Sequence, residues 1–135
     1  YRDTVTSLGR DSGDGLTFHE AFRAARAAGW LPGASGLARA DGSLADLTKQ
    51  PVIAGYVVTP GWENTSDQGC LDHSPQLGQN LGYHAVVIVG TGSIGSSDRL
   101  VYIENSWGLS WGWNGIGVMT ESLHRRLVRE LWIVT

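Results

Sequence analysis

His84 and Asn105 are the residues of this 135-residue sequence whose types and spacing could perform chemistry together. His84 lies at the start of an apolar run over residues 83–89, and Asn105 directly follows a second run over residues 100–104. A histidine at the start of one strand and an asparagine at the end of the next can lie side by side in an antiparallel sheet. The amide oxygen would then fix the imidazole tautomer, so that the other ring nitrogen acts as a base.

Asn105 opens a block rich in tryptophan and glycine, Asn105-Ser106-Trp107-Gly108. A tryptophan covering the contact between His84 and Asn105 would exclude water and strengthen the hydrogen bond. A base held by an orienting residue serves a nucleophile such as a thiol. The one cysteine, Cys70, precedes His84 in a loop with no helical pattern behind it, so no helix dipole would activate its thiol. Cys70 is therefore not favoured as the nucleophile.

Composition excludes several classes of protein. The net charge is −3, from 10 basic and 13 acidic residues, so we expect neither nucleic acid nor an anionic membrane surface as a partner. The apolar runs are only as long as strands, which predicts no membrane span. The length fits a single domain over residues 1–135. One cysteine excludes an internal disulfide and leaves the compartment open.

Periodicity predicts a strand-rich α+β domain with one clear helix near its N-terminus. Thr17 and Glu20 have capping-box spacing, apolar residues then recur at helical spacing, and Gly29 with Pro32 supplies a stop, which predicts a helix over residues 18–28. Residues 37–50 read as a polar connection with one helical turn after Ser43. Five strands are predicted, at residues 52–58, 83–89, 100–104, 116–120 and 127–134, with a long loop at 59–81 and a hairpin loop at 91–98.

Other candidate residues favour simpler interpretations. Cys70, Asp72 and His73 lack the paired spacing of a zinc site, so neither a metal nor a cofactor is expected. His19 and His124 are expected as solvated surface groups. Trp62 and Trp113 fit a substrate groove as well as they fit simple packing, and strand alternation places Glu104 on the face opposite Asn105.

Three ordered blocks, at residues 82–90, 102–108 and 111–117, resemble the papain-like cysteine peptidases. The resemblance is firm from Pro51 onward and looser before it. It implies an α+β, papain-like fold with an antiparallel, barrel-like lobe equivalent to the family's C-terminal lobe. It also implies that His84 is the base, that Asn105 orients it and that Trp107 shields their contact, with Ser106 and Trp111 as supporting residues of the same block.

The sequence departs from the family pattern because no block with the upstream cysteine and glutamine is visible. One hypothesis is therefore a peptidase domain, cleaving peptides or proteins, whose nucleophile lies outside this chain. The alternative is a catalytically inactive papain-like domain that serves as a structural or binding module in a cell-surface or virion assembly. In either case a lone lobe would expose an apolar face. We therefore expect a Cys-bearing N-terminal segment or a partner protein to cover the face with His84 and Asn105.

Overall fold

The structure is a computed structural model and describes residues 15–43, 47, 49–63, 65–66, 68–71, 79–95 and 98–135. The chain divides into two compact units, residues 1–38 with 134–135, and residues 39–133. In chain order the elements are α2 (Phe18–Ala27), β1 (Leu37–Arg39), β2 (Val52–Val58), α4 (Pro60–Glu63), β3 (Gly82–Ile94), β4 (Asp98–Glu104), β5 (Ile116–Thr120), α5 (Glu121–Leu127) and β6 (Val128–Val134). The strands form one sheet in the order β1-β6-β2-β3-β4-β5. The single-domain organisation expected from length stays a prediction.

Helix α2 confirms the prediction made for residues 18–28 to within one residue. Thr17 accepts a hydrogen bond from the backbone N–H of Glu20, and the Glu20 carboxylate accepts one from the backbone N–H of Thr17. At the other end, the N–H of Trp30 reaches the carbonyl of Ala25, and Gly29 has φ +75°. Both ends are thus closed by local hydrogen bonds that the sequence encodes directly.

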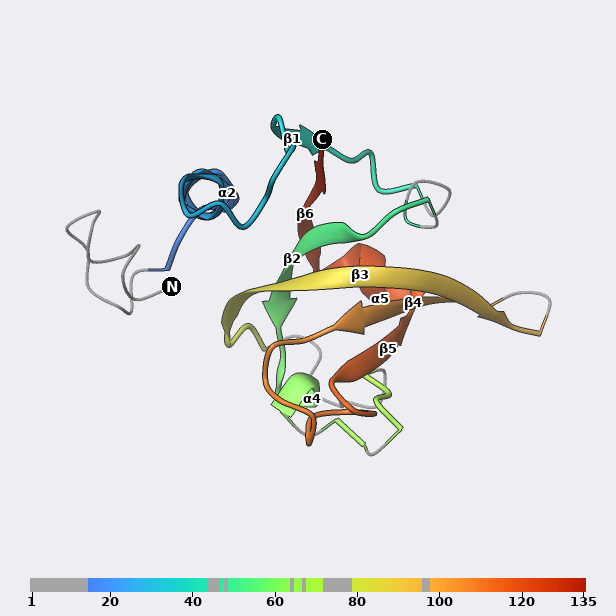
Figure 1. Cartoon of the computed structure of the whole chain (residues 1–135). Coiled ribbons are helices and arrows are strands. Elements are labelled where there is room, and N and C mark those ends of the chain that lie inside the picture. Colours follow the sequence, from blue (N-terminus) through green and yellow to red (C-terminus); the bar gives the residue numbers. More distant parts are fainter. Residues whose placement is uncertain are drawn as a thin grey trace. The chain divides into compact units, whose positions relative to one another are not determined.

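The sheet of the larger unit is antiparallel from β6 through β5, with β2 and β3 at its centre (Figure 1). Helix α5 packs against β2, β4 and β5 and lies behind β3 in the view of Figure 1. Strand side chains that alternate toward α5 form the core together with residues of α5 itself. The strands contribute Val52, Ala54, Tyr56, Val86, Ile88, Val101, Ile103 and Leu131, and α5 contributes Leu123 and Leu127. The strand-rich α+β class predicted from the sequence is confirmed.

The predicted hairpin joins β3 and β4, but its loop is shorter than the expected residues 91–98, because both flanking strands run further than their composition indicates. Strand β3 continues to Ile94 and β4 begins at Asp98, and the two pair from Val87 opposite Glu104 to Ile94 opposite Asp98. Backbone ladder bonds need no apolar side chain, so a Gly- and Ser-rich stretch can still pair.

The sequence prediction missed α5 and misplaced His124, which is not a solvated surface group. Thr120 caps the helix by accepting from the N–H of Leu123, and Arg125 pairs with Glu121 one turn earlier. His124 is only 2% exposed, and its Nδ1 lies 2.6 Å from the hydroxyl of Tyr56. The seven residues of α5 are too few for a clear helical pattern, so this segment read as a turn before a strand.

Two short elements lie in segments that the sequence presented as connections. Strand β1 occupies Leu37–Arg39, and α4 occupies Pro60–Glu63 within the expected loop at residues 59–81. The turn expected after Ser43 falls largely outside the described residues, although the N–H of Leu47 bonds the Ser43 carbonyl. No helix in the described ranges is long and apolar enough to cross a membrane.

The buried pair of His124 and Tyr56 predicts an acid-sensitive fold. Burial, reinforced by Arg125, lowers the pKa of His124 from 6.5 to about 4. His124 therefore binds a proton at a higher pH in the unfolded chain than in the folded chain. Its contribution to the free energy of unfolding is complete above pH 6.5 and is lost as the pH falls toward 4. We expect a loss of about 3 kcal/mol from this residue, measured as the free energy of urea unfolding at several pH values.

His124→Gln should remove this part of the pH dependence. His19→Gln is the matched control, because His19 is exposed on α2 and should leave the pH profile as it is. Equal losses between pH 7 and pH 4 in the wild type and in His124→Gln would contradict the prediction.

Candidate active site

His84 and Asn105 meet because β3 and β4 are antiparallel neighbours. His84 lies in the second position of β3, and Asn105 directly follows the last residue of β4. The Nε2 atom of His84 lies 2.8 Å from Oδ1 of Asn105. His84 is half-buried and Asn105 is buried, so this contact is largely screened from water. The structure thus brings together the two residues that the sequence singled out, while their chemical roles stay predictions.

A backbone contact of Ser106 determines which way the Asn105 amide points. The N–H of Ser106 donates to Oδ1 of Asn105 at 2.8 Å. A backbone N–H can only donate, so the amide atom facing it must be the oxygen. The same oxygen faces His84, so Nε2 must carry the proton. In the neutral ring Nδ1 is then the basic nitrogen, and no described residue hydrogen-bonds to it.

Trp107 covers the imidazole, as its predicted role as a shield requires. The ring centroids of Trp107 and His84 are 4.9 Å apart with an interplanar angle of 30°. Behind Trp107 lie Trp111, at 6.0 Å in an edge-to-face arrangement, and Trp62, at 6.4 Å. The indole N–H of Trp111 donates to the carbonyl of Trp62. We name Trp62, Trp107 and Trp111 the tryptophan cluster.

Burial decides between a substrate groove and packing for Trp62, while the role of Trp113 stays a prediction. Trp62 is fully buried, so it packs, whereas Trp113 is 64% exposed. Nothing near Trp62 in the sequence signals its burial beneath Trp107, because the contact depends on how α4 folds back toward the loop after β4. Sequence reasoning also missed the amide-fixing role of the Ser106 backbone.

The loop between β4 and β5 is closed by its own backbone bonds. The N–H of Asn105 donates to Gly115, and that of Gly115 donates to Trp111. Gly117 on β5 lies against the Trp111 ring, where an added Cβ would come within 2.6 Å of the indole. This close fit keeps Trp111, and through it the rest of the tryptophan cluster, in place.

Cys70 lies far from the imidazole. Its backbone forms a parallel bridge with Val118 of β5, and Val118 is aligned with Tyr102 of β4 and through it with Gly90 of β3. In the sheet order, β4 separates the strand beside Cys70 from β3, which carries His84. This placement argues against Cys70 as the partner of His84.

The described residues contain no group of three or more His, Cys, Asp or Glu side chains that could hold a metal ion. Asp72 and His73, which the sequence places near Cys70, lie outside the described residues. The expectations of no metal and no cofactor stay predictions.

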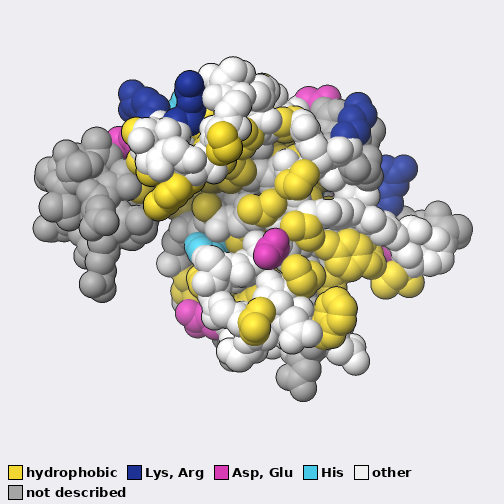
Figure 2. Space-filling model, viewed as in Figure 1, with side chains coloured by type: hydrophobic (Ala, Val, Ile, Leu, Met, Phe, Trp, Pro, Cys, Tyr) yellow, Lys and Arg dark blue, Asp and Glu magenta, His cyan; other side chains and the backbone are white. Residues whose placement is uncertain are grey.

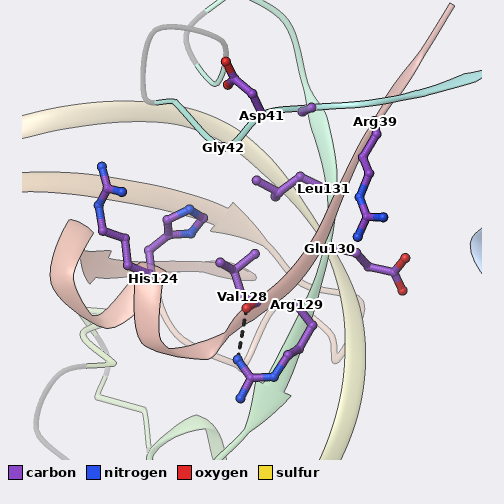
Figure 3. Close-up of a pocket in the computed structure, with 10 residues that line it drawn as sticks. Arg39, Asp41, Gly42, His124, Val128, Arg129, Glu130 and Leu131 are labelled. Carbon is purple, nitrogen blue, oxygen red and sulfur yellow. Dashed lines mark hydrogen bonds between the residues drawn. The ribbon is translucent and has the colours of Figure 1, made fainter.

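A polar hollow of about 300 Å³ lies beside α5 and β6, with His124, Gly42 and Leu131 among its lining residues (Figure 3). Its arginines have other contacts. Arg129 donates to the carbonyl of Val128 at 3.0 Å, and the guanidinium of Arg39 lies over the ring of Trp132. This hollow therefore lacks a converging set of charged groups and contains neither His84 nor Asn105.

A second hollow, of about 440 Å³, reaches the candidate site itself. Apolar side chains of β2 and β3 form most of its wall, and Glu104, Asn105 and Ser106 lie at one side. An apolar hollow of this size is where a substrate or a covering segment would lie.

Comparison with known proteins identifies relatives of this architecture. The family model described as papain family cysteine protease matches residues 38–128, more than half of the chain. An uncharacterised peptidase C1-like protein of Acanthamoeba polyphaga mimivirus is 28% identical over 92 residues, which cover 65% of this chain and 29% of that protein.

Solved structures of three cysteine proteases share the fold. Xylellain from Xylella fastidiosa has a TM-score of 0.56 at 24% identity, covering 76% of this chain and 40% of its own. Bromelain from Ananas comosus, in complex with the E64 inhibitor, has a TM-score of 0.54 at 19% identity, covering 76% and 50%. The proform of the ragweed pollen allergen Amb a 11 reaches 0.60 at 19% identity, covering 84% and 38%. The chain thus spans half or less of the length of these relatives, and its fold is papain-like, as the sequence predicted.

The contact between Gly117 and Trp111 predicts a sensitive position. Gly117→Ala should lower the free energy of unfolding by about 1–3 kcal/mol, because the methyl group overlaps the indole. Gly90→Ala is the matched control, since no atom lies within 4 Å of its Cβ position, and it should cost less than about 0.5 kcal/mol. Urea unfolding followed by tryptophan fluorescence measures both, and equal losses would show that the close fit is unimportant.

Proposed function

Because the chain belongs to the papain family of cysteine proteases, we propose that it provides the base and its orienting residue for peptide-bond hydrolysis by a thiol outside these 135 residues. The observation that carries this proposal is the hydrogen bond from His84 Nε2 to Asn105 Oδ1, which leaves Nδ1 as the basic nitrogen. An oriented, partly shielded imidazole is what a cysteine nucleophile requires.

The proposed reaction has two halves. Nδ1 of His84 takes the thiol proton, and the thiolate attacks the carbonyl carbon of the scissile peptide bond. The imidazolium then gives this proton to the leaving amine, so that an acyl-thioenzyme forms as the C–N bond breaks. Water, deprotonated by the same nitrogen, hydrolyses the thioester and restores the thiol. Throughout, Asn105 keeps its hydrogen bond to Nε2–H and holds the ring in one orientation.

Two observations support a thiol from outside the chain. Cys70 is the one cysteine of the sequence, and its bridge to Val118 places it beside β5, whereas His84 lies on β3. The chain also spans only 29% of the mimivirus protein and 40% of xylellain. A Cys-bearing N-terminal segment, the partner expected from the sequence, would seat over the face beside His84 and Asn105.

The proposal predicts where a thiol-reactive peptide electrophile attaches. In the full-length protein, we expect an adduct on a cysteine other than Cys70, formed about 10²–10⁴ times more slowly after His84→Ala. In the isolated 135-residue chain, we expect Cys70 to react no faster than free cysteine, at the same rate with and without His84. Intact-mass measurement followed by peptide mapping reads out both.

His19→Ala is the control, because it removes a histidine far along the chain from the candidate site. An adduct on Cys70 that depends on His84 would overturn the external thiol. A full-length protein in which no cysteine shows His84-dependent reactivity would favour the alternative, an inactive structural or binding module such as one of a cell-surface or virion assembly.

A further inference from the structure

The face of the sheet that points away from α5 is largely apolar. In the paired strands β2 and β3, the side chains of Ile53, Tyr83, Ala85 and Val87 point to this side, opposite to Tyr56 on the core side. Tyr83 is 72% exposed. Figure 2 looks onto this face, where hydrophobic side chains gather over β3 around an acidic one. We name this surface the outer sheet face.

The outer sheet face contains the 440 Å³ hollow, so an occupant can insert side chains into it. An apolar surface of this kind beside a candidate site is typical of one that another segment covers. The matched region makes up only 40% of xylellain and 50% of bromelain, so these relatives contain further protein of the kind that could cover it.

Glu104 is the charged residue among those that line the hollow. It lies at the end of β4 opposite Val87 of β3 and Ile116 of β5, and it lines the same hollow. The carboxylate is exposed, and within the described part of the chain it has no hydrogen bond or ion pair. A segment covering the hollow would remove water from this carboxylate, which is costly unless a cation replaces the water.

We propose that the segment covering the outer sheet face places apolar side chains in the hollow and pairs an arginine or lysine with Glu104. The proposal rests on the proposed function, since it takes the Cys-bearing segment as the occupant. A guanidinium would pair best, because it can donate two parallel hydrogen bonds to one carboxylate. Glu104 directly precedes Asn105, so the ion pair would anchor the covering segment next to the hydrogen bond that orients His84. Glu104 is then a positioning residue.

The test is a charge-swap experiment in the full-length protein. Glu104→Lys should lower the midpoint of thermal unfolding by about 4–8 °C at low salt, because it places two cations together under the covering segment. Glu63→Lys is the matched control, as Glu63 is an exposed acid on α4 outside the hollow, and it should shift the midpoint by less than half as much. When Glu104→Lys is combined with a Glu in place of its basic partner in the Cys-bearing segment, most of the lost midpoint of unfolding should return.

Three results would overturn the inference. Glu104→Lys could shift the midpoint of unfolding no more than Glu63→Lys does at every ionic strength. Alternatively, no replacement of a basic residue in the Cys-bearing segment could restore the midpoint of Glu104→Lys. The midpoint could also stay unchanged while KM rises only for peptides with a basic side chain, which would make the substrate the partner of Glu104. The electrophile adduct separates these failures from failure of the proposed function. If the wild-type protein forms the His84-dependent adduct, the proposal of an external thiol stands, whatever the effect of the Glu104 substitution.

Discussion

The orientation of the Asn105 amide is the constraint on which the candidate site depends, because a rotation by half a turn would present an N–H to His84 instead of an oxygen. The backbone N–H of Ser106 prevents that rotation by donating to the same oxygen. A donor fixed by the main chain thus determines the protonated nitrogen of a side chain on another strand. The hydrogen bond from Asn105 to Gly115 in turn fixes the main chain.

The packing beneath the site links it to the core through a series of rings. Trp107 covers His84, Trp62 lies behind Trp107, and Tyr56 contacts Trp62 with the ring centroids 5.6 Å apart. Tyr56 in turn hydrogen-bonds His124 of α5. Burial raises the pKa of the Tyr56 hydroxyl, so this group keeps its proton and is able to donate it to Nδ1 of His124. Helix α5, which the sequence did not predict, therefore contacts the last ring of the series that supports the candidate site.

The sequence predicted those features whose causes are local or directly periodic. The ends of α2 follow from Thr17 and Gly29, and β2 follows from a run that is rich in β-branched and aromatic residues. The meeting of His84 with Asn105 was predictable because two successive strands with a short connection pair as antiparallel neighbours. Sequence reasoning failed where distant packing decides the outcome. His124 is polar in isolation, and only the approach of Tyr56 from β2 makes it a core residue.

One energetic feature fits the orienting role that we propose for Asn105. The Nδ2 group of Asn105 is buried and has no hydrogen-bond partner in the described part of the chain, at a cost of about 1–3 kcal/mol. A residue that served only to stabilise a turn would gain from exposing this group or from replacing it with an apolar one. This cost is explained if the oxygen of the same amide must stay fixed toward His84. The amide cannot rotate to give its nitrogen a hydrogen-bond partner without losing that contact. The arrangement is therefore that of a residue held for its oxygen, which is what orientation of a catalytic imidazole requires.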